Sequence, residues 1–349
     1  MIGRVLLAEP RGFCAGVEMA IKALTWMVRV FAAPVYCYHE IVHNAAVVEI
    51  FERAGVVFVD DITTVPPGSV IMLSAHGSGP EVVSLAVSSA TVMVDAVCPL
   101  VTKVHHEVKR AAANGFDILY VGHEGHDEAL GAIAQAPGAV TLVDPDRGLA
   151  GFTPADPGKV ALLAQTTLGQ FEWQGVLDDA RKEYAGVHTS RKSDLCYATT
   201  NRQRAVELLA KEATLVLVVG SENSSNTQAL VRVARNAGVA SYRIDGPHDI
   251  EPDWFDGHEI IGVTAGASAP DQRVQSVVAH LRSDRLIEVV RITEEDEYFP
   301  LPPALRMLIH ALQALVEGAY ACARPGRPGP VDEDREWGAT EALEILSSD

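Results

Sequence analysis

Several features that would set a protein's location or its partners are missing from this chain of 349 residues. No apolar run reaches the roughly 20 residues of a membrane-spanning helix, and the first residues show no secretory signal, so we expect a cytoplasmic protein without a membrane partner. Basic residues are scarce, because 28 Lys and Arg stand against 46 Asp and Glu, a formal net charge of −18. So acidic a surface disfavours nucleic acid as a partner, although local donors can still hold a small anion.

The five cysteines include no closely spaced pair, since the nearest two, Cys14 and Cys37, are 23 residues apart. Structural zinc sites usually contain close Cys pairs. An odd number of cysteines in a chain expected to be cytoplasmic also fits a disulfide framework poorly. The cysteines are therefore expected to be ligands of a larger metal centre, catalytic groups or buried packing residues.

Aromatic residues make up only 6% of the chain, whereas 48% of it is hydrophobic. This composition favours small α/β layers with buried parallel strands. Short runs rich in Val, Ile and Leu, each followed by a polar or glycine-rich loop, predict such strands, and helical patterns fill most of the gaps. The runs are residues 5–9, 35–39, 56–60, 70–77, 91–98, 118–126, 140–144, 160–167, 188–196, 215–226, 241–245 and 260–268.

The polar residues that follow these runs recur in step through three blocks of four strands. The first strand of each block is followed by a cysteine, the second by donors 28 or 29 residues beyond the cysteine, and the fourth by a further donor. In block order these residues are Cys14, His43 and His76; Cys98, His126 and Thr166; and Cys196, the Ser224-Ser225-Asn226 run and Ser268. Ligands of open α/β sheets bind at the carboxyl ends of the strands, where all these residues are expected to lie.

The predicted fold is therefore α/β, with three related small domains whose parallel sheets are arranged as a trefoil around one centre. A helical extension follows them at the C-terminus. The predicted domains are residues 1–94, 95–190 and 191–285, followed by the extension 286–349. Within the extension the sequence predicts a closing strand at 285–292, an amphipathic helix at 301–320, a flexible linker at 323–338 and a short terminal helix. The amphipathic helix is expected to dock on the body or on a second subunit, and the oligomeric state stays open.

Three thiolates in step, without a fourth, favour a 4Fe–4S cluster with one iron free of protein ligands. Zinc is the inorganic alternative, and three unconnected, buried cysteines are the other. The predicted ligands are Cys14, Cys98 and Cys196. Cys37 lies inside an apolar run and is predicted to be core packing, and Cys322 is predicted to be unconnected with the centre.

The imidazoles, hydroxyls and amide at the other strand ends predict a diphosphate cradle. Several of them precede helical patterns, where backbone N–H groups favour anions, although any single Ser could simply cap a helix. Glu128, two residues after His126, is expected either to pass protons or to be an ordinary first-turn carboxylate. Thr166 and Thr167 are expected to relay a proton, to hold a substrate hydroxyl or to cap a helix. Four histidines have no counterparts in step and are predicted to be structural, namely His39, His105, His106 and His123.

Nine motifs occur in order between about residues 4 and 303: PRGFCAGVEMAI, HEIVHN, SAHG, CPLVTKVH, GHEGH, QTT, CYATTNRQ, NSSNT and GVTAGASAPD. Together they resemble those of the 4-hydroxy-3-methylbut-2-enyl diphosphate reductase family, the last enzymes of the methylerythritol phosphate route to isoprenoids. The resemblance implies three α/β domains around one 4Fe–4S cluster with Cys14, Cys98 and Cys196 as ligands. It also implies removal of the allylic hydroxyl as water with two electrons and two protons, giving isopentenyl and dimethylallyl diphosphate.

The resemblance also assigns roles to the loops. Diphosphate would be bound by His43, His76, His126, Ser224, Ser225, Asn226 and Ser268. Glu128 would be the proton donor, Thr166 would lie close to the substrate hydroxyl, and flavodoxin or ferredoxin would supply electrons. Three positions, Tyr38, Val97 and Asp127, differ from the residues usual in the family, and Asp127 is expected to raise the pKa of the neighbouring Glu128.

Three other functions stay open at this point. One is a paralogue that acts on a different small diphosphate. Another is a three-cysteine iron–sulfur enzyme of the quinolinate synthase type, which does not share the NSSNT and GHEGH loops. The last is a non-catalytic diphosphate-binding protein, which needs neither Glu128 nor the thiolates.

Overall fold

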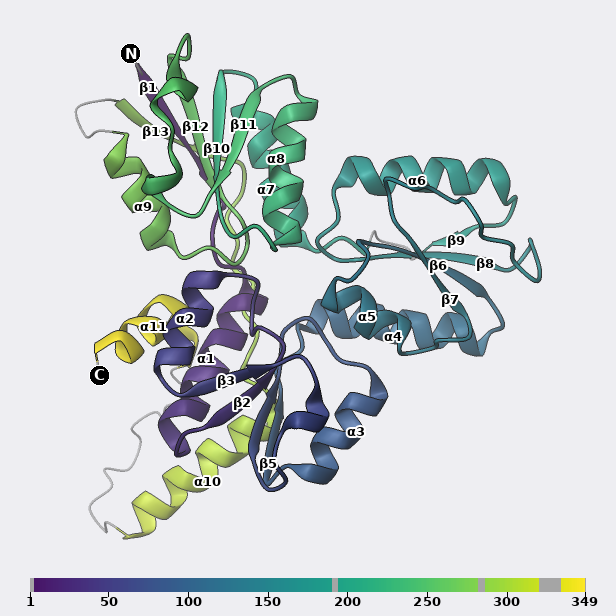
Figure 1. Cartoon of the computed structure of the whole chain (residues 1–349), viewed down its shortest axis with the longest axis vertical. Helices are drawn as coiled ribbons and strands as arrows, with labels where there is room; N and C mark the ends of the chain where they lie inside the picture. The colour runs from purple at the N-terminus through teal and green to yellow at the C-terminus, as the bar shows by residue number, and fades with distance from the viewer. Residues whose placement is uncertain (1–2, 190–193, 282–285, 320–333, 349) are drawn as a thin grey trace. The chain divides into compact units, whose positions relative to one another are not determined.

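The structure is a computed structural model that describes residues 3–189, 194–281, 286–319 and 334–348. It contains three parallel sheets with flanking helices (Figure 1), and helices follow them at the C-terminus, so the predicted α/β class and helical extension are confirmed. The chain falls into two compact units, one made of residues 1–14 and 100–296, the other of residues 15–99 and 297–349. Within the described ranges, no helix is both long and apolar enough to cross a membrane.

Every strand pairs with its neighbours in parallel. The N-terminal sheet has the spatial order β3 (Val56–Val59), β2 (Val35–Tyr38), β4 (Val70–Leu73) and β5 (Val92–Asp95). The middle sheet has the order β7 (Val140–Val143), β6 (Asp117–Val121), β8 (Val160–Ala164) and β9 (His188–Thr189). The closing sheet has the order β11 (Ala240–Ile244), β10 (Leu215–Val219), β12 (Ile260–Ala265), β1 (Arg4–Glu9) and β13 (Leu286–Arg291). The last strand confirms the predicted closing strand.

The same strand order recurs in the three sheets, but their membership differs from the predicted blocks. The first strand of each block pairs in the sheet of the block before it: β5 joins the N-terminal sheet, β9 the middle sheet and β1 the closing sheet. For β5 and β9 the reason is the right-handed crossover, which returns a strand beside the strand that precedes its connecting helix. The predicted allocation of these first strands is corrected, whereas the domain limits at residues 94, 190 and 285 stay a prediction.

Helices cover both faces of the middle and closing sheets (Figure 1). On the middle sheet, α4 (Pro99–Ala113) and α5 (Asp127–Ile133) lie on one face and α6 (Gln170–Glu183) on the other. On the closing sheet, α7 (Tyr197–Leu209) and α8 (Ser225–Asn236) lie opposite α9 (Asp271–His280). Short 3₁₀ turns span Ile62–Thr64, Pro247–Asp249, Pro252–Phe255 and Asp334–Glu336.

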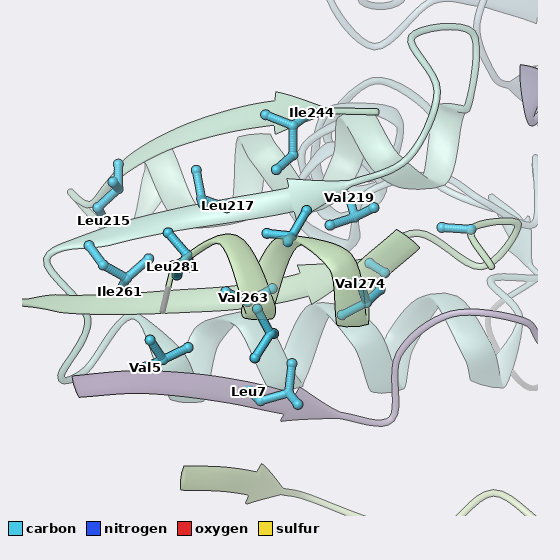
Figure 2. Packing of buried hydrophobic residues seen from close by; sticks show 14 residues of the cluster. Val5, Leu7, Leu215, Leu217, Val219, Ile244, Ile261, Val263, Val274 and Leu281 are labelled. Atoms are coloured by element: carbon cyan, nitrogen blue, oxygen red, sulfur yellow. The ribbon is translucent and has the colours of Figure 1, made fainter. Parts of the chain in front are cut away.

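Alternating side chains of the closing sheet divide its core between the two faces. Figure 2 shows the face that packs against α9, with residues from four strands, and on the opposite face Leu6 and Val218 pack against α7 and α8. The buried cluster of Figure 2 includes Val5, Leu7, Leu215, Leu217, Val219, Ile244, Ile261, Val263, Val274 and Leu281. Each such side chain stabilises the fold by about 1.5–3 kcal/mol when fully buried, which holds the strand ends in a fixed frame.

Among the described residues, five α-helices belong to the unit of the N-terminal sheet. They are α1 (Ala15–Val30), α2 (Ala45–Arg53), α3 (Pro80–Ser89), α10 (Pro303–Ala319) and α11 (Ala339–Ser348). The predicted amphipathic helix is α10, which contacts β5 and buries Leu305 and Ile309 while Met307 and Leu315 stay exposed. The predicted terminal helix is α11, which packs on α1 and α2 (Figure 1).

The end of the predicted flexible linker is docked instead on α1. Asp334 is only 1% exposed, and its carboxylate lies 3.1 Å from Lys22 Nζ, which is itself buried. The same ammonium donates to the Asp334 carbonyl at 2.6 Å, and the Tyr298 hydroxyl lies 2.6 Å from the carboxylate. Trp337 adds an edge-to-face contact with Trp26, with ring centroids 5.9 Å apart. Because of these contacts, the prediction of a flexible linker is wrong at residues 334–338. The rest of the predicted linker and Cys322 lie outside the described residues.

We predict that Asp334→Ala destabilises this unit by about 3 kcal/mol, because it removes the buried carboxylate that pairs with the buried Lys22 ammonium. The free energy of unfolding, together with hydrogen exchange of the α11 amides, measures the effect. Arg53→Ala is the matched control: it removes an exposed pair with Glu49 on α2, which contributes well under about 1 kcal/mol. Equal effects of the two substitutions would contradict the role of the buried pair.

Candidate active site

Each predicted ligand cysteine lies between the end of a strand and the start of a helix. Cys14 directly precedes α1, Cys98 precedes α4 and Cys196 precedes α7. One backbone hydrogen bond anchors each cysteine, since its N–H donates to a carbonyl in the loop that follows the neighbouring strand. The pairs are Cys14 with Ala267 at 3.2 Å, Cys98 with Ala75 at 3.0 Å and Cys196 with Thr166 at 3.0 Å. The repeat inferred from the sequence is thus matched by three equivalent backbone contacts.

Cys14 and Cys196 lie in the same unit and interact electrostatically. Burial, with a smaller contribution from the charge of Cys14, raises the pKa of Cys196 to about 11. Donors oppose this rise, because the backbone N–H and the hydroxyl of Thr199 lie 3.2 Å and 3.0 Å from Cys196 Sγ. Asn226 Nδ2 lies 3.3 Å from the same hydroxyl, so the Thr199 proton is available to the sulfur. A half-buried thiol that lies beside two donors and interacts with a second thiol is suited to bind a metal centre as thiolate.

Glu128 and Thr166 form a buried pair beyond the carboxyl ends of strands β6 and β8 of the middle sheet. Glu128 is 2% exposed, and its two carboxylate oxygens accept from the backbone N–H of Thr166 at 2.7 Å and from its hydroxyl at 2.9 Å. Burial outweighs these bonds and raises the pKa of Glu128 to about 7, with a small further rise from Asp194. The Tyr120 hydroxyl opposes the rise, although its oxygen makes no standard hydrogen bond within the described ranges. The expected rise in pKa is therefore present, but burial is its main cause rather than Asp127.

His126 begins the helix that carries Glu128. Its side chain caps α5, because Nδ1 accepts from the backbone N–H of Glu128 at 3.2 Å. A backbone N–H can only donate, so Nδ1 is the acceptor and the neutral ring carries its proton on Nε2. The ring can therefore present a donor while it orients Glu128.

The Ser224-Ser225-Asn226 run forms the first turn of α8. Ser224 caps the helix by accepting from the Thr227 backbone N–H at 3.3 Å, as the capping alternative anticipated. Ser225 is 8% exposed, and Asn226 is 3% exposed. The three side chains thus surround a helix N-terminus, where backbone N–H groups and the helix dipole favour an anion.

The loop after β12 lies against this helix start. Asn226 Oδ1 accepts from the Ala267 backbone N–H at 2.9 Å, and Ser268 beside it is 7% exposed. Gly266 permits the approach, because a Cβ there would overlap with the Thr227 hydroxyl. Ser268 is therefore held next to the donors of α8.

The other unit brings together His43, His76 and Cys98 after strands β2, β4 and β5. The two imidazole rings stack, with centroids 3.9 Å apart and planes at 13°. His43 Nδ1 lies 3.4 Å from Glu40, and His76 Nδ1 lies 3.4 Å from Ser74 Oγ. These contacts fix both rings at the carboxyl edge of the N-terminal sheet.

The predicted site residues therefore gather in two sets, one in each unit. The larger set contains Cys14, Cys196, His126, Glu128, Thr166, Ser224, Ser225, Asn226 and Ser268, and the smaller contains His43, His76 and Cys98. Their individual roles stay predictions. Cys37 is fully buried in the N-terminal sheet and burial raises its pKa, which fits the predicted packing role.

Four residues close to this site were not singled out in the sequence as functional. Thr199 contacts Cys196, and Tyr120 lies beside Glu128. Gln165 and His123 contact Ser225 at 3.1 Å and 3.3 Å. A usable signal existed for Thr199, which stands three residues after Cys196 at a helix start. Gln165 opens the QTT motif, but its partners are distant in the sequence.

Comparisons with known proteins give one consistent result. The model of the family described as "LytB protein" matches residues 5–282. The 4-hydroxy-3-methylbut-2-enyl diphosphate reductase of Bordetella pertussis is 45% identical over 313 residues, 89% of this chain and 96% of the relative. The enzyme of the same name from Mycobacterium leprae is 45% identical over 87% of this chain and 92% of its own length. A solved structure of the E-1-hydroxy-2-methyl-but-2-enyl-4-diphosphate reductase from Plasmodium falciparum matches with a TM-score of 0.86 and 29% identity, over 90% of this chain and all of that one.

The raised pKa of Glu128 predicts a pH-dependent stability. Between its ordinary pKa of 4.5 and the folded value of about 7, the folded protein keeps a proton that the unfolded chain has lost. Stability contributed by this group is therefore complete below pH 4.5 and falls as the pH rises through 7, by about 3 kcal/mol. Glu128→Gln should lack this slope, so the difference in unfolding free energy between the two proteins, measured from pH 5 to pH 8, isolates it. Parallel curves would show that Glu128 titrates normally.

Proposed function

Because the chain belongs to the LytB protein family, whose members are iron–sulfur enzymes, we propose that it is a 4-hydroxy-3-methylbut-2-enyl diphosphate reductase. The proposed reaction removes the allylic hydroxyl of the substrate as water, with two electrons and two protons, and yields isopentenyl and dimethylallyl diphosphate. The observation that carries the proposal is the repeated backbone anchor, which sets each of three cysteines beside donor-bearing strand ends. Relatives that carry this enzyme name at 45% identity over most of the chain support the same reaction.

The proposed cofactor is a 4Fe–4S cluster with Cys14, Cys98 and Cys196 as ligands. The donors around Cys196 and its interaction with Cys14 fit a pair of metal-bound thiolates. Cys98 is proposed as the third ligand because it occupies the same place in the repeat as Cys14 and Cys196 and makes the equivalent backbone hydrogen bond, to Ala75. When bound, such a cluster supplies single electrons and a Lewis-acidic iron.

The diphosphate is proposed to lie among hydroxyls, an amide and imidazoles. On the larger unit these are Ser224, Ser225, Asn226, Ser268 and His126, and on the smaller they are His43 and His76. Binding through the diphosphate fixes the distance from these donors to the allylic hydroxyl, which is how remote contacts accelerate a reaction at another bond.

Glu128 is proposed to deliver a proton and Thr166 to contact the substrate hydroxyl. A carboxyl group with a pKa of about 7 is partly protonated near neutral pH, which suits a general acid. Thr166 holds both carboxylate oxygens, so the acid has one orientation. Electrons are proposed to come from flavodoxin or ferredoxin, in a cytoplasmic setting.

Anaerobic purification and a turnover assay test this function. We expect about four irons and four sulfides per chain, the EPR signal of a reduced cluster, and conversion of 4-hydroxy-3-methylbut-2-enyl diphosphate by chemically reduced protein. Cys98→Ser should lose the third ligand and most turnover, whereas Cys37→Ser should keep the cluster, because Cys37 is core packing. Stoichiometric zinc without sulfide would exclude the cluster, and turnover of another diphosphate only would favour the paralogue.

Glu128→Gln should lower kcat by about 10²–10⁴-fold, because it removes the proton and keeps the shape of the side chain. Diphosphate affinity should stay nearly unchanged, since Glu128 is not among the proposed diphosphate donors. Glu124→Gln is the control, because Glu124 is an exposed carboxylate on the loop just before α5 and pairs with Arg147 at the surface. Normal turnover of Glu128→Gln would remove Glu128 from the proton path.

A further inference from the structure

The hydroxyl of Ser225 is contacted by two side chains of the middle sheet. Gln165 Nε2 lies 3.1 Å from Ser225 Oγ, and His123 Nδ1 lies 3.3 Å from the same oxygen. Gln165 follows β8 directly and is fully buried, with 0% of its surface exposed, while His123 follows β6. All three residues belong to one unit. The N-terminus of α8, which packs on the closing sheet, therefore contacts the loops of the middle sheet through the Ser225 hydroxyl.

The orientation of the Gln165 amide is fixed by a donor that cannot act as an acceptor. The backbone N–H of His123 lies 3.1 Å from Gln165 Oε1, so the amide oxygen faces His123. The NH₂ group therefore faces the other way, toward Ser225 Oγ and toward Thr167 Oγ1 at 2.8 Å. It has two hydrogens, one for each hydroxyl.

The proton of His123 is placed by a similar argument. The Arg232 guanidinium, which can only donate, lies 3.4 Å from His123 Nε2. Nε2 is then the acceptor, and Nδ1 carries the proton toward Ser225. Glu172 holds Arg232 at 2.9 Å and lies 3.8 Å from Nε2, an ion-pair distance for a protonated ring but longer than a hydrogen bond. A doubly protonated ring would also donate from Nδ1, so both forms direct a proton at the Ser225 oxygen.

A serine hydroxyl has two lone pairs and one proton. Gln165 and His123 fill both lone pairs, so the Ser225 hydroxyl can only donate its own proton to a further partner. We propose that Gln165 and His123 are positioning residues that make Ser225 an obligate donor to an anionic oxygen of the substrate's diphosphate. The proposal rests on the proposed function, which assigns Ser225 to the diphosphate. It predicts discrimination against a substrate with an alcohol or amine donor at this position, because no lone pair is left to receive it.

A double-mutant cycle tests the proposal on the anaerobic holoenzyme, with inorganic diphosphate as the probe and the KM and kcat of turnover as a second readout. Gln165→Leu and Ser225→Ala should each raise the dissociation constant for diphosphate about tenfold, the effect of losing one hydrogen bond to a charged group. Because Gln165 acts through Ser225, the double variant should bind no more weakly than either single variant. KM should rise more than kcat falls.

Gln203→Leu is the matched control. Gln203 is also 0% exposed and makes two amide hydrogen bonds, with Gln170 at 2.8 Å and with Leu168 at 3.1 Å. Its effect on diphosphate binding should be the same with and without Ser225→Ala, because it does not touch that hydroxyl. Multiplicative losses in the Gln165 cycle, about a hundredfold in the double variant, would overturn the proposal while leaving the proposed function intact.

Gln165→Glu gives a second test that preserves the size and shape of the side chain. In this variant one carboxylate oxygen accepts from the His123 N–H, and the other accepts the Ser225 proton. The Ser225 proton then points away from the diphosphate, so diphosphate binding should be weaker than in Gln165→Leu. Unchanged affinity in a folded Gln165→Glu protein would overturn the proposal. A wild type that neither binds diphosphate nor turns over the substrate would instead overturn the proposed function, and this inference with it.

Discussion

One backbone hydrogen bond, made three times, organises the candidate site. Each cysteine N–H donates to a loop carbonyl beyond the neighbouring strand, at Ala267, Ala75 or Thr166. Main-chain bonds do not depend on the protonation of the side chain, so these bonds hold each cysteine backbone after its strand whatever the state of its thiol. The same bonds draw each cysteine to a donor-bearing loop, because Thr166 and the Ala267–Ser268 segment supply both the carbonyl and neighbouring polar groups. The proposed ligand and substrate positions are thereby linked through short stretches of chain.

Much of this frame was predictable because it depends on local patterns. Runs of Val, Ile and Leu that end in polar residues mark buried parallel strands, and the common spacing of the cysteines marks the repeat. Sheet membership was not predictable in the same way, since β1 pairs with β12 and β13 near the other end of the sequence. The prediction of a flexible linker was wrong at residues 334–338 for a related reason. Residues 334–338 have the composition of a linker, but Lys22, the partner that orders Asp334, is distant in the sequence and stands in an ordinary helical pattern.

Within the candidate site, positions were more predictable than interactions. The repeat pointed to Ser225 and to His126, two residues before Glu128, and both Ser225 and Glu128 lie in the first turn of the helix that follows a strand. The cause of the Glu128 pKa was misjudged, because Asp127 is a neighbour in the sequence whereas burial is a property of the folded chain. The sequence predicts a structural role for His123, because His123 has no counterpart in the other blocks. Its partner, Ser225, comes from another block, and a comparison of equivalent positions cannot find a contact between different ones.

The proposed site also explains how a protein with a net charge of −18 can bind a diphosphate although no Lys or Arg is among the proposed diphosphate ligands. Hydroxyls are weak anion ligands when their protons can turn elsewhere, and in our proposal Gln165 and His123 remove that freedom at Ser225. A carboxylate nearby would repel the anion, but burial keeps Glu128 largely protonated below pH 7. Burial of the site therefore has two effects. It strengthens the electrostatic interaction of the fixed dipoles with the anion, and it keeps a proton on Glu128, the proposed acid.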